Sequence, residues 1–293
     1  MYPRIIDFGV FELFGRSIPV AINSYGVMIA LGFAAVLHGL NRELPRKGHG
    51  EHLSSAIIFW AALGGIISSK IYYLIEFRDK IKYPPTNLGE IIDLMRSGFV
   101  FYGGLIGGSV SVLITIMFYR RPVWSVIDSV GCLLLIGYGI GRIGCFLAGD
   151  GCYGMPGDTP WCVTFPDPLV PSFVDPNGQR YYVTSNLPTG LPEGAILTAV
   201  HPTPIYETII SCISFCFLWS IRLKVEQKSG VLFGLSILAM GIERFTIEFW
   251  RINEKYFWGQ FSGAQAISLA LMTIGIIIVI YRWSRSSQLT LDQ

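Results

Sequence analysis

The sequence predicts an all-α membrane protein with seven transmembrane helices and an outer loop domain of roughly 50 residues between the fourth and fifth helices. Three observations lead to this fold class. The 293 residues are 52% hydrophobic and 14% charged, with a mean hydropathy of +0.51, whereas about 25% charge is usual in soluble domains. Apolar runs near the roughly 20 residues of a spanning helix recur along the chain. A long proline-rich segment, 150–202, separates two groups of these runs.

Each predicted span is an apolar run that few charges interrupt. An odd number of spans places the two termini on opposite sides of the membrane. Lys and Arg favour the short cytoplasmic loops, and the long 150–202 loop holds one basic residue, Arg180. We therefore expect an outer N-terminus, a cytoplasmic C-terminus and a translocated 150–202 loop. The spans are expected at residues 18–40, 53–77, 98–118, 124–148, 203–222, 230–250 and 262–282.

Two short segments outside the spans are expected to lie at the membrane surface. Residues 1–17 mix apolar and charged positions and are too short to cross a bilayer. Residues 86–97 carry Asn87 and Glu90 at the spacing of a helix capping box. Their apolar stripe is typical of an amphipathic helix that lies on a membrane.

The 150–202 segment is expected to form a small outer subdomain, a head or lid, within a single polytopic domain of residues 1–293. It holds nine of the sixteen prolines and two strand-like pieces, 161–165 and 181–185. Loops of this length without helical periodicity are commonly functional. We therefore expect the segment to face a substrate.

Small residues and cysteines have mainly structural interpretations. Cys152 and Cys162 lie ten residues apart in the outer loop and fit either a disulfide or two free thiols. The other four cysteines fit small buried thiols. Small residues four apart predict close helix packing; the pairs are Gly64 with Ser68, Gly103 with Gly107, Gly104 with Gly108, and Gly137 with Gly141.

Residues 137–154 combine one arginine, Arg142, with many glycines at the end of the fourth predicted span. A guanidinium costs about 2.5–3.5 kcal/mol at the centre of a membrane, so it needs a charged partner, water or an anionic ligand. The donors of arginine fit a phosphate, and glycines let a ligand approach the backbone. This pattern predicts a lipid phosphate at Arg142. The net charge of +2, without a basic face rich in aromatics, gives no indication of nucleic-acid binding.

The other charged residues inside the predicted spans allow two interpretations. They form internal ion pairs, for which Arg244 and Glu248 have the favourable i,i+4 spacing, or they build a site for a charged substrate. Tyr25 and Tyr102 fit either interfacial aromatic positions or polar contacts in such a site. The charges concerned are Lys70, Asp128, Glu207, Glu243, Arg244 and Glu248.

Several short motifs follow one another along the spans. They are Tyr25-Gly26, Lys70-Ile71-Tyr72-Tyr73, Tyr102-Gly103-Gly104-Leu105-Ile106-Gly107, Gly141-Arg142-Ile143-Gly144, His201-Pro202 with Tyr206-Glu207, Glu243-Arg244-Phe245 with Glu248-Phe249 and Arg251, and Ser262 to Gln265. This ordered set resembles the prolipoprotein diacylglyceryl transferase family. The resemblance runs from Ser24 to Arg282 and is weakest in residues 1–20, the first inner loop and residues 155–200.

The resemblance implies a seven-span bacterial inner-membrane enzyme whose active site opens to the periplasmic side. Such an enzyme transfers the diacylglyceryl group of phosphatidylglycerol to the lipobox cysteine thiol of a prolipoprotein, the first step of lipoprotein maturation, and releases glycerol phosphate. It uses no metal and no organic cofactor; its partners are the lipid and the prolipoprotein signal peptide. The implied catalytic residues are Arg142, Arg244, Tyr102 and Glu248, and the implied substrate-binding residues are Tyr25, Lys70, Gly103, Gly104, Asp150, Gly154, His201 and Glu207.

In this interpretation Arg142 and Arg244, with Lys70 assisting, stabilise the charge of the leaving phosphate. Asp150 and Glu207 orient the arginines. The base that takes the thiol proton is left open between Tyr102, Glu248 and His201; the last of these also fits a structural role at the start of its span.

The chain departs from the family pattern at several positions. Tyr102 stands where the family has histidine, Cys145 and Ala148 stand where it has asparagines, Asp150 lies near the expected glutamate, and Met240 replaces a tyrosine. Two alternatives therefore stay open. One is a paralogue that uses another lipid or acceptor, or that has no catalytic activity. The other is a transporter of an anionic solute, which predicts a pathway open alternately to both sides.

Overall fold

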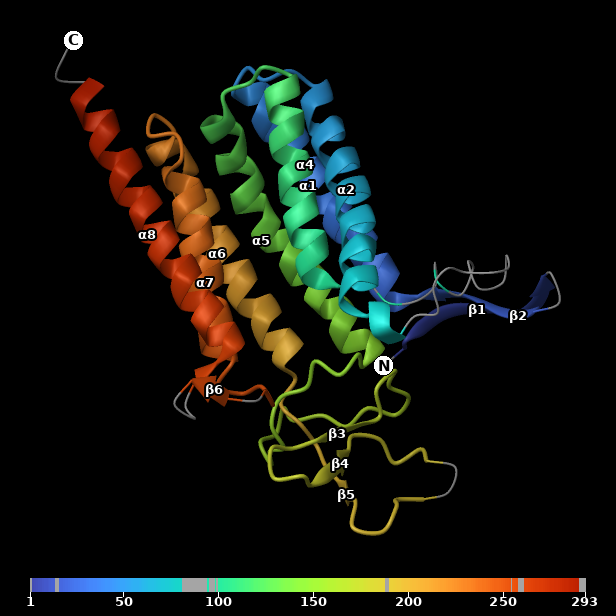
Figure 1. Cartoon of the computed structure of the whole chain (residues 1–293). Helices are drawn as coiled ribbons and strands as arrows, with labels where there is room; N and C mark the ends of the chain where they lie inside the picture. Colours follow the sequence, from blue (N-terminus) through green and yellow to red (C-terminus); the bar gives the residue numbers. More distant parts are fainter. Residues whose placement is uncertain are drawn as a thin grey trace. The chain divides into compact units, whose positions relative to one another are not determined.

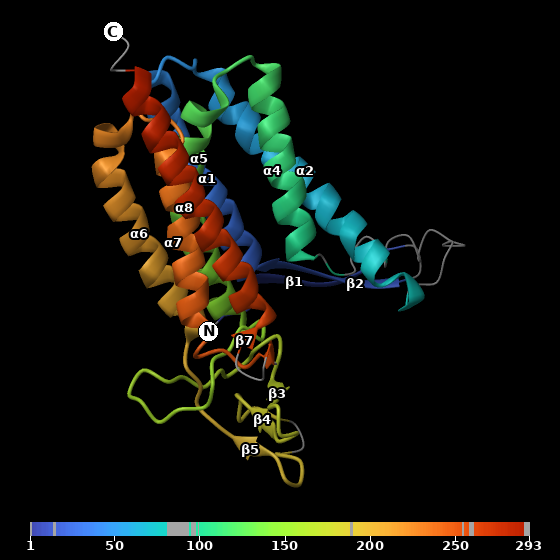
Figure 2. The same cartoon turned by 60° about the vertical axis from the view of Figure 1, so that its left-hand side comes forward.

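The structure is a computed structural model that describes residues 2–13, 16–80, 94, 98, 100–187, 190–253, 255–257 and 261–289. It is mostly helical (Figures 1 and 2). Six helices of the described residues are long and apolar enough to cross a membrane. They are α1 (Ser24–Arg46), α2 (His52–Glu76), α4 (Phe101–Phe118), α5 (Val123–Ala148), α6 (Thr203–Val225) and α8 (Gly263–Leu289). The predicted 230–250 span contains a shorter helix of 17 residues, α7 (Val231–Ile247).

Most residues of the apolar helices are not covered by the rest of the protein. In the most apolar window of each of the six helices, between 11% and 39% of the residues are buried. Large side chains such as Ile66, Ile114 and Ile213 are more than half exposed. Apolar surface of this extent needs lipid rather than water around it. The chain is therefore a multi-pass membrane protein.

The beginning of the chain differs from the prediction. Strands β1 (Arg4–Leu13) and β2 (Arg16–Asn23) form a two-stranded sheet. Helix α1 begins only at Ser24, whose backbone N–H donates to the carbonyl of Pro3 at 3.0 Å. The expected span start at residue 18 was wrong because hydropathy does not separate strand from helix. The β-branched side chains in β2 recur at every second position, as in a strand.

The chain forms two compact units, which we describe separately. The first consists of Met1–Asp7, Ala21–Val36 and Ile127–Gln293, and the second of Phe8–Val20 and Leu37–Val126. The second unit contains α2, α4 and the 3₁₀ turn η1 (Arg78–Lys80). The predicted surface helix 86–97 lies outside the described residues, apart from Leu94.

In the second unit, small residues bring α2 and α4 into close contact, as their spacing predicted. A Cβ atom at Gly107 would lie 1.8 Å from the Ser68 hydroxyl, and one at Gly103 would lie 2.7 Å from the Ser68 carbonyl. The Ser68 hydroxyl donates to the Gly103 carbonyl at 2.7 Å. Backbone approach of this kind stabilises helix pairs in lipid, where apolar side chains gain little from leaving the solvent.

In the first unit, α7 packs along α8, again through glycines: a Cβ atom at Gly275 would lie 2.8 Å from the Gly234 carbonyl. Asp128, a buried charge on α5, accepts hydrogen bonds from the backbone N–H groups of Gly230 and Phe233, both at 2.7 Å. These N–H groups belong to the start of α7 and lack partners within the helix. The structure therefore supports the structural interpretation of Asp128.

The segment between α5 and α6 lies beyond the neighbouring ends of these helices (Figure 1). It contains a three-stranded sheet of β3 (Ser172–Val174), β4 (Arg180–Tyr182) and β5 (Ile196–Leu197), in which β3 is antiparallel and β5 parallel to β4. Strand β4 overlaps the predicted piece 181–185. The described piece 161–165 forms no strand, and Val163 makes only an isolated bridge to Val200. A small core of its own holds the segment together: Tyr153, Phe165, Val183 and Val200.

Candidate functional site

Three helix ends of the first unit bring charged residues together beside the segment 149–202 (Figure 1). Arg142 lies near the end of α5, Glu207 near the start of α6 and Arg244 near the end of α7. Glu248 and Arg251 follow α7. We call these five residues the Glu207 cluster.

Three guanidinium groups surround one fully buried carboxylate, that of Glu207. Arg142 donates from Nε to Glu207 Oε2. Arg251 Nη1 lies 3.5 Å and Arg244 Nη1 3.8 Å from Glu207 Oε1. These arginine side chains are 14% to 28% exposed, so their charges interact through a medium much less polar than water. The sequence-predicted convergence of Arg142 and Arg244 is therefore present in the structure.

A second carboxylate holds Arg244 from the other side. Glu248 Oε2 lies 2.8 Å from Arg244 Nη2. Its other oxygen accepts hydrogen bonds from the Ser262 hydroxyl and the Asn253 amide, both at 2.6 Å. Ser262 belongs to β7 (Phe261–Ser262), which pairs with β6 (Lys255–Phe257) before α8. With this set of partners, Glu248 is suited to orient Arg244.

Three buried polar atoms of this region have no hydrogen-bond partner among the described residues: Arg244 Nη1, Glu243 Oε1 and Glu248 Oε2, the last of which is engaged only in the ion pair with Arg244. A buried polar group without a partner costs about 1–3 kcal/mol. Beside the buried Glu207 carboxylate, such atoms are suited to bind a further group. A water molecule, a proton or an anionic ligand meets this need, and the guanidinium donors suit an anion.

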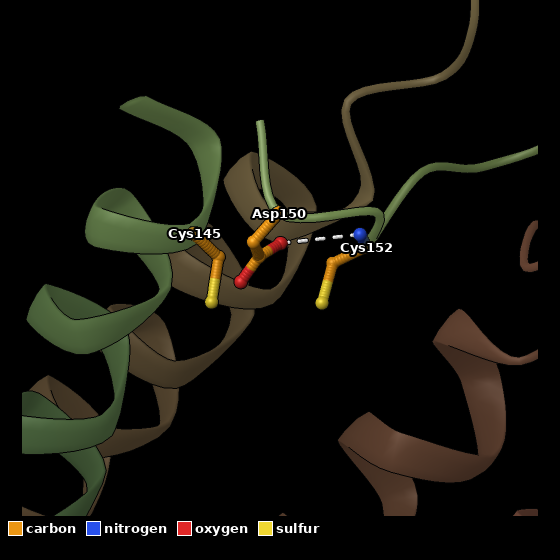
Figure 3. A group of neighbouring side chains, drawn as sticks. All are labelled: Cys145, Asp150 and Cys152. Carbon is orange, nitrogen blue, oxygen red and sulfur yellow. Dashed lines mark hydrogen bonds between the residues drawn. The ribbon is translucent and has the colours of Figure 1, made fainter. Parts of the chain in front are cut away.

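Arg142 also contacts two thiols. Its Nη1 donates to Cys145 Sγ at 3.3 Å and to Cys152 Sγ at 3.7 Å. Figure 3 shows these two side chains on either side of Asp150, whose carboxylate accepts the Cys152 backbone N–H at 3.1 Å. The two sulfur atoms and a carboxylate oxygen lie within 4.8 Å of one another, close enough to hold a metal ion. A hydrogen bond from the Cys145 thiol, with help from Arg142, lowers the pKa of the Cys152 thiol to about 6.

The turn after α5 positions this thiol pair. Gly149 and Gly151 have φ values of +60° and +88°, which side chains rarely permit. The Tyr153 hydroxyl bridges the carbonyls of Gly149 and Val170 at 2.8 Å each. Burial raises the pKa of Tyr153, so this hydroxyl keeps its proton and both hydrogen bonds at neutral pH.

The glycines around Arg142 pack helices against one another, and their predicted contact with a ligand stays a prediction. A Cβ atom at Gly137 would lie 2.8 Å from Val36, and one at Gly144 would lie 3.3 Å from the Tyr25 Cα atom. The α5 glycines therefore let α1 approach. Gly154 donates its N–H to the His201 carbonyl at 3.0 Å, and a Cβ atom there would lie 2.7 Å from the His201 side chain.

Two predicted binding residues line a cleft of about 590 Å³. Tyr25 lines it from α1, and Asp150 lines it together with Ala148 and Leu169. Arg142 is not among the lining residues of this cleft. His201 Nδ1 makes a hydrogen bond with the Tyr206 hydroxyl at 2.9 Å, which fits a structural role at the start of α6.

Four predicted site residues belong to the second unit. Tyr102, near the start of α4, is 47% exposed, and its ring contacts that of Phe101. Lys70 Nζ donates to the Gly98 carbonyl at 3.4 Å. Gly103 and Gly104 face α2. Their roles toward a substrate stay predictions.

Sequence reasoning missed two features of the site. Arg251 is the third guanidinium group beside Glu207, although it lies outside the predicted spans. Its position three residues after Glu248 was the available sequence signal. The pairing of Cys145 with Cys152 was missed as well. Cys152 was considered only with Cys162, yet all six cysteines are free in the structure, and Cys162 contacts the Thr159 hydroxyl instead.

Comparison with known proteins gives consistent results. The family described as prolipoprotein diacylglyceryl transferase matches residues 13–281. A protein of Clostridium tetani named phosphatidylglycerol–prolipoprotein diacylglyceryl transferase is 33% identical over 275 residues, which cover 92% of this chain and 95% of the relative. Proteins with the same name from Shewanella oneidensis and Mannheimia succiniciproducens are 27% and 28% identical, over 95% and 92% of this chain and 94% and 91% of their own lengths.

Proposed function

This chain belongs to the prolipoprotein diacylglyceryl transferase family, and we propose that its Glu207 cluster binds the phosphate of phosphatidylglycerol during transfer. The chain is a transferase of lipoprotein biosynthesis: it moves a diacylglyceryl group from phosphatidylglycerol to a prolipoprotein. The observation that carries our proposal is the buried Nη1 of Arg244, which has no hydrogen-bond partner among the described residues and lies 3.8 Å from a carboxylate that three guanidinium groups share.

The chemistry of the transfer explains why cations are needed. The thiol sulfur of the acceptor cysteine forms a bond to the terminal glycerol carbon of the diacylglyceryl group, and the bond from that carbon to the phosphate oxygen breaks. The phosphodiester, with one negative charge, becomes the monoester of glycerol phosphate, with a second charge at the leaving oxygen. The thiol proton passes to a base. Donors fixed where this charge develops stabilise the transition state more than the bound lipid.

We propose that Arg142 and Arg244 stabilise the negative charge that develops on the leaving phosphate. Glu207 holds Arg142 through Nε, and Glu248 holds Arg244 through Nη2, so each guanidinium keeps further donors for a ligand. Because the groups are fixed before the lipid binds, little reorganisation is needed at the moment of reaction. Arg251 adds a third positive charge beside Glu207.

The proton of the acceptor thiol must pass to a base. Glu248 already has Ser262, Asn253 and Arg244 as partners, and His201 is bonded to Tyr206. Tyr102, the third candidate from the sequence, belongs to the second unit, so its role as the base stays a prediction.

We further propose a seven-span arrangement in a bacterial inner membrane, with the Glu207 cluster near the outer surface. At 1.5 Å per residue, the 17 residues of α7 cover about 26 Å, at the lower limit for a spanning helix. Arg222, Lys224 and Lys228 lie at the connection of α6 and α7, at the helix ends opposite Arg142 (Figure 1). The tendency of basic residues to stay inside then places the N-terminus and the 150–202 segment outside.

The test is reconstituted transfer. Purified protein is incubated with labelled phosphatidylglycerol and a signal peptide that carries a lipobox cysteine, and thioether-linked diacylglycerol is measured. We expect transfer by the wild type, none by Arg142→Ala, and near wild-type transfer by Arg222→Ala, which removes an arginine at the opposite end of α6. Full activity of Arg142→Ala would remove the phosphate site from the mechanism.

A further inference from the structure

The thiols of Cys145 and Cys152 are adjacent, and nothing in the transfer chemistry uses them. Cys145 lies in the last turn of α5, and Cys152 follows the turn that Gly149 and Gly151 shape. Both sulfur atoms point to the same side in Figure 3 and lie within 4.8 Å of each other. A disulfide needs a sulfur–sulfur distance of about 2.05 Å, so the two side chains must turn toward each other to form one.

We propose that Cys145 and Cys152 form a reversible disulfide, and that this bond releases Arg142 for the lipid phosphate. The second part rests on the proposed function, in which Arg142 binds that phosphate. In the reduced protein Arg142 Nη1 donates to both sulfurs. A thiolate at Cys152 is thus an internal anion that competes with the phosphate for the same donor. A disulfide carries no charge and accepts hydrogen bonds weakly, so its formation ends the competition.

The oxidation is an ordinary thiol–disulfide exchange with a disulfide oxidant, such as oxidised glutathione. The Cys152 thiolate attacks one sulfur of the oxidant, forms a mixed disulfide and releases one thiolate. The Cys145 thiol then loses its proton and attacks Cys152 Sγ, which releases the second thiolate. Two electrons pass to the oxidant, and the two protons pass to the solvent or to the released thiolates. Arg142 and Arg251 beside Cys152 favour the attacking thiolate.

The same side chains also have the composition of a metal site, because Asp150 lies between the two thiols. The surrounding charge argues against this use. Arg142 Nη1 is within 3.7 Å of both sulfurs, so a divalent cation bound between them would lie next to a fixed guanidinium. A disulfide meets no such repulsion.

The disulfide is tested on the full-length protein in detergent. Samples are equilibrated in glutathione buffers of increasing oxidised fraction, free thiols are alkylated, and chymotryptic peptides are analysed by mass spectrometry. Cleavage after Phe146 and Tyr153 separates Cys145, Cys152 and Cys162 into different peptides. We expect a linked pair of the Cys145 and Cys152 peptides that reducing agent removes.

Variants define the pair. The link should persist in Cys162→Ser and disappear in Cys145→Ser and Cys152→Ser. Absence of a link at every glutathione ratio, or a link between Cys152 and Cys162, would overturn the proposal. The proposal would also be overturned if one equivalent of Zn²⁺, added to the reduced protein, blocked alkylation of both thiols but did not bind to Cys145→Ser or Cys152→Ser.

The effect on the lipid is measured on the same samples. The KM for phosphatidylglycerol should be roughly five- to tenfold lower in the oxidised than in the reduced wild type, the scale of one net hydrogen bond. In Cys152→Ser the KM should not respond to the buffer. A disulfide without a change in KM would refute the competition with Arg142. If the disulfide forms but the protein transfers no lipid in either redox state, the proposed function is refuted and the proposal of a disulfide still holds.

Discussion

Substitution of Arg244 tests whether its guanidinium group acts in catalysis or only stabilises the fold. In Arg244→Ala, Glu248 loses one partner but keeps the hydrogen bonds from Ser262 and Asn253. Because the Arg244 side chain is 28% exposed, losing this ion pair should destabilise the fold by only about 1 kcal/mol. The same substitution deletes Nη1, the buried donor that has no hydrogen-bond partner among the described residues. Loss of one donor aimed at developing charge typically costs about 2.7–4 kcal/mol of transition-state stabilisation, or roughly 10²–10³ in kcat.

The two magnitudes differ enough to be measured apart. Initial rates of thioether formation and thermal unfolding in detergent are recorded for the wild type, Arg244→Ala and Arg244→Lys. We expect both variants to unfold near the wild-type temperature. Arg244→Ala should lose at least a hundredfold in rate, and Arg244→Lys should recover only part of it, because one ammonium cannot hold Glu248 and a phosphate together. The reasoning is refuted if Arg244→Ala keeps more than a tenth of the rate, or if its loss of rate follows its loss of stability.

Three further predictions concern neighbouring groups. Glu207→Gln leaves three guanidinium groups around a neutral side chain, so it should lower the free energy of unfolding by about 3–5 kcal/mol. An unfolding temperature equal to that of the wild type would contradict this. Alkylation of Cys152 by iodoacetamide should rise with a midpoint near pH 6, because its pKa lies below that of an unfolded thiol. The stability gained from the thiolate is correspondingly lost as the pH falls through 6. Cys145→Ala, which removes the hydrogen-bond donor, should move the midpoint upward, and an unchanged midpoint would contradict this. Asp128→Ala removes the acceptor at the start of α7 and should cost about 1 kcal/mol of stability with the transfer rate preserved; a rate that falls a hundredfold would assign Asp128 to the site.

The sequence predicted which segments form long helices better than it predicted where the first helix begins. Apolar length alone locates α2, α4, α5, α6 and α8, since few other structures bury so many consecutive apolar residues in lipid. It fails before Ser24, because a run such as Ile18 to Ile22 is as apolar in a strand as in a helix.

The charged part of the site was predictable for a similar reason. A guanidinium or carboxylate inside a span is costly without a partner, so Arg142, Glu207 and Arg244 had to find one another or a ligand. The thiol pair was not predictable, because its contact depends on the turn at Gly149 and Gly151 and on the direction in which the chain leaves α5. Spacing of seven residues has no special meaning outside a helix.

An experimental structure with a phosphatidylglycerol analogue bound tests most directly where the headgroup lies. We predict phosphorus density within hydrogen-bonding reach of the guanidinium groups of both Arg142 and Arg244, with Arg244 Nη1 donating to a phosphate oxygen. A headgroup found elsewhere, with Arg244 Nη1 bonded only to protein or water, would contradict the account.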